Sequence, residues 1–446
     1  MTLLWLRPVR EHDYSVRSRA PPRLQSNGPS PMRVLLIPVG SAGDVHPYVG
    51  LALALRGRGH DVTLATSAYF RPLIARLGLR LVPLGTVEQY ETLTAHPNLW
   101  HHRKGLNVIA GALQTVSADL YRVVREHGVG DDTVVIAPGL AFAVRTAHDT
   151  LGIRLVTAHL QPSCFHSVHR SPVLHAALQR INALPRVLKR LLFALIDRVA
   201  DRTLDAAVNT HRQELGLGRV RHITSRWWHS PTCVIGMFPD WFAPVQPDWP
   251  PHVHLTGFPL YDERDATEVP PEVAAFLDAG DPPVVFVAGS SNRQAERFFQ
   301  AAADACGQLG RRGLLLTQYR EQLPAKMPAG VRHFDYAPFT EVLPRAAALV
   351  HHGGIGSAAQ ALAAGVPHLV MPMTFDQPDN ADRLRELGVA RVLPPAQFRG
   401  SAVARELEQL LGSTETAVRC RTLAQRLSGV NGLRAACEVI EAVAGC

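Results

Sequence analysis

The stretch AAALVHHGGIGSAAQALAAGVPHLVMPMTFDQPDN, residues 346–380, decides the fold of the second half of this chain. An apolar strand over 346–350 runs into two histidines and a glycine loop, and a helix is expected to open at about Ser357. Glycine lets the backbone approach an anion closely, and a helix N-terminus offers free N–H groups and a partial positive charge. The loop therefore predicts a phosphate seat, formed by Gly353, Gly354, Gly356 and Ser357.

Two polar residues follow the next expected strand, which begins at His368. The carboxylate of Asp376 can accept hydrogen bonds from sugar hydroxyls, and the amide of Gln377 can both donate and accept. An aspartate here can also cap the helix expected to start near Pro378. A phosphate seat and a hydroxyl-binding pair in one stretch indicate a nucleotide-sugar site.

Strand and helix patterns alternate along the whole chain. This alternation is typical of parallel, doubly wound α/β sheets. The pattern restarts after a proline-rich stretch, 244–259. Strands are expected at 33–39, 61–65, 80–82, 133–137 and 154–158, and then at 283–288, 313–317, 332–335, 347–350 and 368–371.

Two Rossmann-like domains are the simplest interpretation of this pattern. The predicted boundaries are 32–258 for the N-terminal domain, 259–282 for a linker and 283–446 for the C-terminal domain. Ligands bind such sheets beyond the carboxyl ends of the strands, so the site is expected in a central cleft between the domains. Residues 1–31 are rich in Arg, Pro and Ser and predict a disordered extension, which leaves Met32 as a candidate start.

The block at 351–380 resembles the donor-binding signature of the inverting GT-B glycosyltransferases of family GT1. That family includes plant and mammalian UDP-glycosyltransferases and sterol and antibiotic-tailoring enzymes. The resemblance is collinear from about Met32 to the C-terminus. Three further stretches are similar to the catalytic rhamnosyltransferases of rhamnolipid synthesis: GSAGDVHPYVGLA (40–52), HSPTCVIGMFPDWFAPVQPDWP (229–250) and HLTGFPLYD (254–262).

The resemblance assigns roles on the donor side. One loop histidine is expected to contact the diphosphate; His352 matches on the glycines, and His351 is kept as the alternative. The family's sugar-binding pair falls on Asp376 and Gln377.

Two more segments complete the expected donor site. Ser290 and Ser291 follow the first strand of the second domain, where hydroxyls and free N–H groups can bind phosphate, although an ordinary turn is the alternative. The segment from Tyr336 to Phe339 is similar to the family's base-recognition element, in which an aromatic ring stacks on the nucleobase. Core packing is the competing explanation for these two rings.

The resemblance places the catalytic base in the turn 40–47, before a helix expected over 47–58. Many relatives have a histidine there; this chain has Asp44, as in the antibiotic-tailoring branch. The expected reaction is an inverting displacement in which Asp44 takes the acceptor's proton. An ordinary aspartate, with a pKa of about 3.9, is a weak base, and a desolvated pocket would relieve that mismatch. A capping role for Asp44 and a fallback base, His46, remain open.

No cofactor or metal is expected beyond the nucleotide sugar itself, dTDP-L-rhamnose or UDP-glucose. The chain has no D-x-D triplet. A histidine cluster at His159, His166 and His169 matches no standard zinc spacing.

The acceptor side is harder to interpret. Irregular sequence over 84–107 carries Tyr90 and Trp100 and is consistent with pocket loops. A helix expected within 171–205 has leucines on one side, at Leu184, Leu188, Leu191, Leu192 and Leu195 with Val187, and basic residues around the rest. Such a helix packs on a core or lies on an anionic membrane. The rhamnolipid resemblance implies a hydroxylated lipid acceptor such as a 3-hydroxyalkanoyl dimer.

Composition narrows the class of protein. The net charge of +8 comes from scattered arginines, and no basic block with interleaved aromatics suggests nucleic acid. Six cysteines without a C-x-x-C pair, and no apolar run of about 18 residues, favour a cytoplasmic protein, with peripheral association with the inner membrane left open. A UDP-glucose enzyme acting on a sterol or polyketide and a non-catalytic nucleotide-sugar-binding partner are the alternatives.

Overall fold

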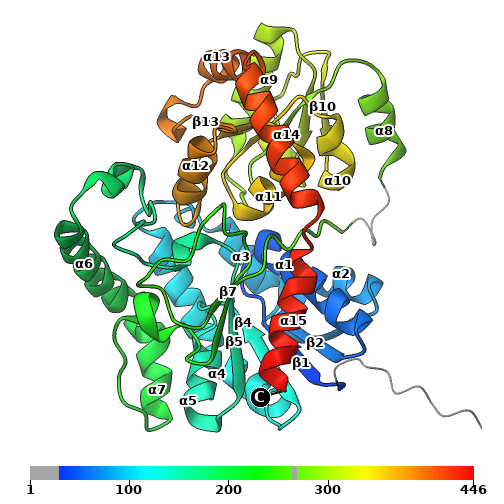
Figure 1. The fold of residues 1–446 in the computed structure, drawn as a ribbon. Coiled ribbons are helices and arrows are strands. Elements are labelled where there is room, and N and C mark those ends of the chain that lie inside the picture. The colour runs from blue at the N-terminus through cyan, green and yellow to red at the C-terminus, as the bar shows by residue number, and fades with distance from the viewer. Residues whose placement is uncertain (1–29, 264–268, 446) are drawn as a thin grey trace, which may run out of the picture. The chain divides into compact units, whose positions relative to one another are not determined.

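The strand patterns form two separate parallel sheets in the computed structural model, which describes residues 30–263 and 269–445 (Figure 1). The predicted extension over 1–31 therefore lies outside the described residues, apart from its last two. Residues from Pro31 onward belong to one unit.

The first sheet has seven strands in the order β3-β2-β1-β4-β5-β6-β7. Their bounds are β1 Arg33–Leu36, β2 Asp61–Ser67, β3 Arg80–Leu84, β4 Thr133–Ala137, β5 Arg154–His159, β6 Cys233–Gly236 and β7 Val253–Leu255. The central strand β1 pairs in parallel with β2 and β4, which sets Val34 opposite Val62 and Val134. The strand order changes direction at β1, and ligands of such sheets bind at that point.

The second sheet repeats the arrangement with six strands, β10-β9-β8-β11-β12-β13. They are β8 Val284–Val287, β9 Gly313–Leu316, β10 Val331–Phe334, β11 Ala348–His351, β12 His368–Val370 and β13 Ala390–Val392. The two sheets confirm the predicted GT-B architecture of two Rossmann-like domains.

Helices cover both sheets. They are α1 Ala42–Gly57, α2 Arg71–Arg76, α3 Val87–Ala95, α4 Gly105–His127, α5 Phe142–Leu151, α6 Arg186–Asp205, α7 His211–Glu214, α8 Pro271–Asp278, α9 Glu296–Leu309, α10 Phe339–Val342, α11 Ile355–Ala364, α12 Gln377–Glu386, α13 Gly400–Leu411, α14 Thr414–Ser428 and α15 Gly432–Ala444. Apolar residues of the strands alternate between two core clusters on each sheet, so both faces of both sheets are buried.

The predicted domain boundaries need two changes. Val273 and Leu277 of α8 are buried in the core of the second sheet, so the predicted linker over 259–282 contains a helix of the second domain. The last helix, α15, packs on α1 and β4, so the chain returns to the first domain at its end (Figure 1). The sequence patterns also missed the short strands β6, β7 and β13.

Candidate active site

The first functional element is the N-terminus of α1, which follows β1. The helix starts at Ala42, five residues before the predicted start, so Asp44 lies in its first turn and not in a loop before it. The backbone N–H of Ser41 donates to Asp44 Oδ2 at 2.8 Å, and the Ser41 hydroxyl donates to the same oxygen at 3.0 Å. Asp44 therefore does take part in a capping interaction, the alternative that the sequence left open.

Gly40 makes room for this carboxylate. Its φ is +135°, and a Cβ added there would come within 2.2 Å of Asp44 Oδ2. Burial raises the pKa of Asp44, although the hydrogen bonds from Ser41 oppose the rise. This is the desolvation that a carboxylate base requires.

Pro47 shapes the same turn from inside the helix. A proline has no N–H, so the carbonyl of Gly43 lacks its usual partner four residues on. That carbonyl oxygen lies 4.0 Å from the position that a Cβ of Gly356 would occupy. The first turn of α1 therefore meets the first turn of α11, which contains Gly356.

The glycine loop leads from β11 into α11. Gly353 has φ +94°, and Gly354 is the N-cap without a side-chain partner, so the first N–H groups of α11 are not capped by this residue. The helix expected to border a phosphate site starts two residues earlier than predicted, at Ile355. Gly356 and Ser357 lie in its first turn.

The two loop histidines have different surroundings. The ring of His351 is fully buried; its Nε2 is 3.1 Å from His368 Nδ1, and its Nδ1 accepts from the Gly353 N–H at 3.2 Å. With both nitrogens engaged inside the protein, His351 does not fit the diphosphate role that was kept open for it. It shapes the loop instead.

His352 points elsewhere, between two glycines. Its ring atoms lie 3.2 Å and 2.6 Å from where Cβ atoms of Gly289 and Gly354 would be, so the glycines create the space for the ring. Its Nδ1 is buried without a hydrogen-bond partner in the described chain. Burial lowers the pKa of His352 to about 4, which leaves the ring neutral near pH 7.

Asp376 brings a second carboxyl group to this point. It is the N-cap residue of α12, and Asn380 Nδ2 donates to its Oδ2 at 2.6 Å. Asn380 also donates to the carbonyl of Gly353 at 3.0 Å, which ties the sugar-binding position to the glycine loop. Burial first, and then the nearby charge of Asp44, raise the pKa of Asp376 to about 7.

Gln377 is less free than the sequence suggested. Its Oε1 accepts from the backbone N–H groups of Met373 and Thr374 at 2.9 and 3.2 Å, and its side chain is 2% exposed. Only its Nε2 remains for a ligand. Its main effect is to hold the loop before α12.

Phe375 was not singled out from the sequence, yet it is strained. Its φ is +58°, a backbone conformation that bulky residues rarely adopt. Its ring meets Trp100 edge to face at 6.0 Å and lies 3.1 Å from the position of a Gly105 Cβ. The strained residue therefore sets Asp376 against the first-domain loop that carries Trp100, which the sequence had assigned to an acceptor pocket.

Cys164 was also missed as a neighbour of the site. Burial raises the pKa of its thiol, and Asp376, Asp44 and Asp379 raise it further. The thiol thus lies among three carboxyl groups. No motif marks a lone cysteine, so the sequence carried no signal for this position.

The remaining donor-side residues have mixed placements. Ser290 is exposed after β8, and its carbonyl accepts from Gln318 at 3.4 Å, whereas Ser291 is buried. The Tyr336 hydroxyl donates to the carbonyl of Asp262, and its ring is 36% exposed. Phe339 packs partly into the core of the second domain, the competing explanation given for it.

His46, the fallback base, is engaged by the connecting segment. Its Nε2 lies 2.7 Å from Glu263 Oε1, and Asp262 accepts from the Thr340 N–H at 2.7 Å. Adjacent acidic residues thus hold the two domains, and His46 is occupied by one of them.

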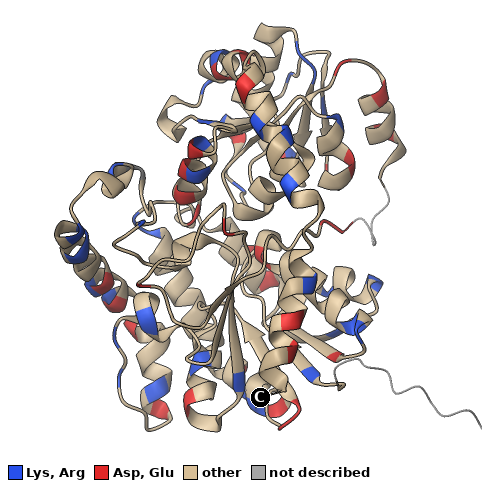
Figure 2. Cartoon of the chain, viewed as in Figure 1, with Lys and Arg blue, Asp and Glu red and all other residues tan. Residues whose placement is uncertain are grey.

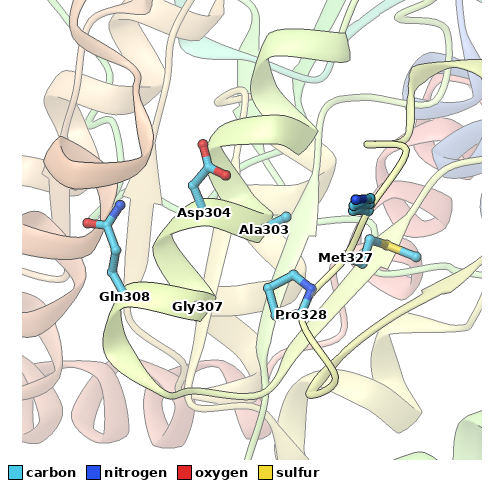
Figure 3. A pocket seen from close by; sticks show the side chains of 7 residues that line it. Ala303, Asp304, Gly307, Gln308, Met327 and Pro328 are labelled. Atoms are coloured by element: carbon cyan, nitrogen blue, oxygen red, sulfur yellow. The ribbon is translucent and has the colours of Figure 1, made fainter.

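An open pocket of about 500 Å³ lies elsewhere on the second domain (Figure 3). Asp304 and Gln308 project from α9, opposite Met327 and Pro328. None of the predicted site residues lines it. Among the described residues, no group of three or more His, Cys, Asp or Glu side chains is arranged to hold a metal.

Two Rossmann-like domains of this architecture make up the GT-B fold. Comparison with family models agrees. Residues 34–170 match the glycosyltransferase family 28 N-terminal domain, and residues 314–429 match the erythromycin biosynthesis protein CIII-like C-terminal domain.

Curated relatives span almost the whole chain. The chain is 31% identical to O-mycaminosyltylonolide 6-deoxyallosyltransferase of Streptomyces fradiae over 423 residues, which cover 92% of this chain and 97% of that protein. It is 30% identical to vancomycin aglycone glucosyltransferase of Amycolatopsis orientalis, over 80% of this chain and 85% of that protein. The protein belongs to the GT1-type glycosyltransferases and is an enzyme of that class.

Solved structures show the same fold. The glycosyltransferase of kitacinnamycin aligns with a TM-score of 0.70 at 19% identity and covers 93% of this chain and 100% of that one. The spinosyn rhamnosyltransferase SpnG aligns with a TM-score of 0.65 at 17% identity, over 92% of this chain and 100% of that one.

Proposed function

We propose that this enzyme transfers a deoxyhexose, L-rhamnose from dTDP-L-rhamnose, with inversion onto a hydroxyl of a lipid acceptor such as a 3-hydroxyalkanoyl dimer. One observation carries the transfer chemistry. Asp44 and Asp376 approach each other closely enough for the charge of Asp44 to raise the pKa of Asp376, and the backbone of Ile355, the first residue of α11, hydrogen-bonds to Asp376.

Asp44 acts as the base in this proposal. Its carboxylate takes the proton of the acceptor hydroxyl as that oxygen bonds to the anomeric carbon. The bond from that carbon to the diphosphate oxygen breaks, and the nucleoside diphosphate leaves from the opposite face. Burial raises the pKa of Asp44 and makes it a better base than an exposed aspartate.

The leaving diphosphate is stabilised by α11 and His352. The N-terminus of α11 faces the developing negative charge, and the ring of His352, which lies beside Gly289 and Gly354, is the further contact. Asp376 binds a sugar hydroxyl, and Gln377 positions its loop. Tyr336 stacks on the base, and the loop of Ser290 and Ser291 borders the phosphates. No metal is required in this scheme, and turnover is expected to persist in EDTA.

The donor and acceptor are the finer part of the proposal. The stretches at 40–52, 229–250 and 254–262 support rhamnose and a lipid. One neighbouring fold is a spinosyn rhamnosyltransferase complexed with thymidine diphosphate, and another, VinC, is in complex with dTDP. We also propose a cytoplasmic enzyme associated peripherally with the inner membrane, where such an acceptor resides.

A second candidate function has the same transfer chemistry but a different acceptor and donor. Curated relatives act on a macrolide, O-mycaminosyltylonolide, and on vancomycin aglycone, which favours a polyketide or other small hydrophobic acceptor. UDP-glucose is the alternative donor. Membership of a family of enzymes argues against a non-catalytic partner.

A mass-spectrometric transfer assay tests these proposals. Purified protein is offered dTDP-L-rhamnose or UDP-glucose, each with a 3-hydroxyalkanoyl dimer or with a macrolide aglycone. Rhamnosylated dimer is expected from the unaltered enzyme. Asp44→Asn should lower kcat by about 10²- to 10⁴-fold and leave dTDP affinity within about twofold.

Product formed only on the macrolide, or only from UDP-glucose, would replace the lipid and rhamnose assignments. Full turnover by Asp44→Asn would overturn the base assignment while leaving the transferase intact.

A further inference from the structure

Helix α6 exposes apolar side chains to solvent. Within the described residues every helix is too short or too polar to cross a membrane, but α6 carries its apolar residues on the outside. Val187 is 63% exposed, Leu191 65% and Leu195 56%. Leu188 and Val199 are exposed as well, and so is Leu184 just before the helix. The spacing of the five helical residues places them along one face of α6.

The inner face of α6 has its own partners. Phe193 packs with Val173 and Ile181 in a small separate core. Lys189 is buried beside them and donates to the carbonyl of His169 and to Asn182 Oδ1, both at 3.3 Å. The core under α6 is formed by other residues, so the exposed leucines do not contribute to it. The core-packing alternative for them is wrong, except for Leu192, which joins the core.

Helix α6 carries charges of both signs (Figure 2), and its acidic and basic residues lie on different sides of the helix. Each acidic residue is turned to the protein: Asp197 accepts from the Ser225 hydroxyl, Asp201 from the backbone of His222 and Ile223, and Asp205 from Asn209. The four arginines of α6 are exposed and have no ion-pair partner in the described chain: Arg186, Arg190, Arg198 and Arg202.

We infer that the outer face of α6 docks on an anionic lipid bilayer. The apolar stripe can insert among the acyl chains of a bilayer, while the guanidinium groups beside it contact the phosphates of the lipid headgroups. A docking protein of acidic surface would satisfy the arginines but not explain a stripe of five exposed aliphatic residues along α6. The helix is also joined to the active site, because the Val173 N–H, in the loop before α6, donates to Asp379 Oδ1 at 2.9 Å. Docking there would bring the acceptor side close to the membrane.

Vesicle co-sedimentation tests this inference without donor or acceptor, so its outcome is independent of the proposed reaction. The unaltered protein is expected to bind vesicles of phosphatidylglycerol and phosphatidylcholine in equal parts, and to bind phosphatidylcholine alone far less. Combining Val187→Ser, Leu191→Ser and Leu195→Ser should weaken binding at least about tenfold. The matched control combines Val129→Ser, Val245→Ser and Val418→Ser, which are similarly exposed away from α6, and should bind as before.

A second variant tests the charges. Replacing Arg186, Arg190, Arg198 and Arg202 by Gln should weaken binding by about fivefold for each arginine and remove its salt dependence. Equal binding to neutral vesicles, or undiminished binding by the serine variant, would overturn the inference. So would light scattering that showed a dimer converted to a monomer by the serine variant, because the face would then belong to a second copy.

Discussion

Asp44 and Asp376 are neighbouring carboxyl groups in this enzyme, but their surroundings differ. Ser41 donates two hydrogen bonds to Asp44, which favour its charged form, whereas Asp376 is buried beside that charge and holds a proton up to about pH 7. Burial raises the pKa of both carboxyl groups; the hydrogen bonds from Ser41 oppose the rise at Asp44, whereas the nearby charge of Asp44 adds to the rise at Asp376. Below about pH 7 the protonated Asp376 can therefore donate a hydrogen bond to a bound sugar.

The pKa of Asp376 predicts how stability depends on pH. The folded protein keeps a proton on Asp376 that the unfolded chain loses near pH 4, so stability should fall as pH rises from about 4 to about 7. Asp376→Asn removes this pH dependence. Between pH 5 and pH 8 the melting temperature of the variant should therefore fall several degrees less than that of the unaltered enzyme. Scanning calorimetry measures this. Asp335→Asn is the control, because Arg320 lowers the pKa of Asp335; parallel curves for the Asp376 variant and the unaltered enzyme would contradict the prediction.

The two loop histidines predict opposite phenotypes. His352→Gln should weaken dTDP binding about tenfold or more, because a hydrogen bond to the diphosphate is lost. His351→Gln should leave dTDP affinity within about twofold but lower the free energy of unfolding by about 1–3 kcal/mol, since two buried hydrogen bonds are broken. Titration calorimetry and urea unfolding measure the two quantities. An equal loss of affinity in both variants would contradict the assignment.

At the scale of elements, α12 connects the donor site to the first domain. Arg383 Nε donates to Asp379 Oδ2 at 2.7 Å, and both side chains are buried. Asp379 also accepts from the Val173 N–H, and Arg383 donates to the carbonyl of Phe242 at 3.2 Å. One buried ion pair therefore holds two loops of the first domain against α12, the helix that follows Asp376.

Breaking this pair should be costly. Arg383→Met leaves the charge of Asp379 buried, and the free energy of unfolding should fall by about 3–5 kcal/mol. Asp379→Asn combined with Arg383→Met should recover part of that loss. Arg122→Met, which removes exposed ion pairs with Asp119 and Glu126 on α4, should change it by less than about 1 kcal/mol. Urea denaturation measures all three, and similar losses for Arg383→Met and Arg122→Met would refute the role of burial.

The sequence predicted elements better than their ends. The long β and α patterns gave both sheets, because buried parallel strands are continuous apolar runs. The start of α1 was missed because Pro47 suggests a first helical residue, whereas here it lies inside the helix. Strands β6, β7 and β13 have three or four residues each, too few to show a periodicity.

Within the site, motifs identified chain positions but not side-chain direction. The glycine pattern located His351 and His352 without showing which ring is buried in the sheet. The strain of Phe375 and the nearness of Cys164 to three carboxyl groups depend on contacts between distant segments. No local pattern encodes such contacts.

At the scale of the whole molecule, α15 fastens the end of the chain to its beginning. Glu441 accepts from Arg58 at 2.5 and 2.7 Å, and its Oε1 lies 2.9 Å from His60 Nε2. Gly50 of α1 leaves room for Leu433, whose side chain would lie 3.1 Å from a Cβ added there. Ala436, Cys437 and Ile440 are fully buried in the core of the first sheet.

Glu441→Gln should therefore lower the free energy of unfolding by about 1–2 kcal/mol at pH 7. The hydrogen bond from Arg58 lowers the pKa of Glu441. Its contribution is present above the ordinary pKa of a glutamate and is lost as the pH falls through the lowered value. Urea unfolding at pH 7 and near pH 3 should show the difference shrinking in acid. Glu438→Gln, which removes an exposed pair with Arg434, is the control; a deficit that persisted in acid would mean that packing is responsible.

Because α15 packs on the first domain, that domain can be completed only at the end of translation. The ribosome makes β1 and α1 first, yet the surface of α1 stays uncovered until residues 432–444 emerge. At roughly 5–20 residues per second, translating the second domain holds the first one incomplete for on the order of ten seconds. During that interval the nascent domain exposes apolar surface that a chaperone can bind. A gene cut between the two sheets would yield a first half that lacks its own last helix, and that fragment is expected to be less stable than the same domain in the full chain.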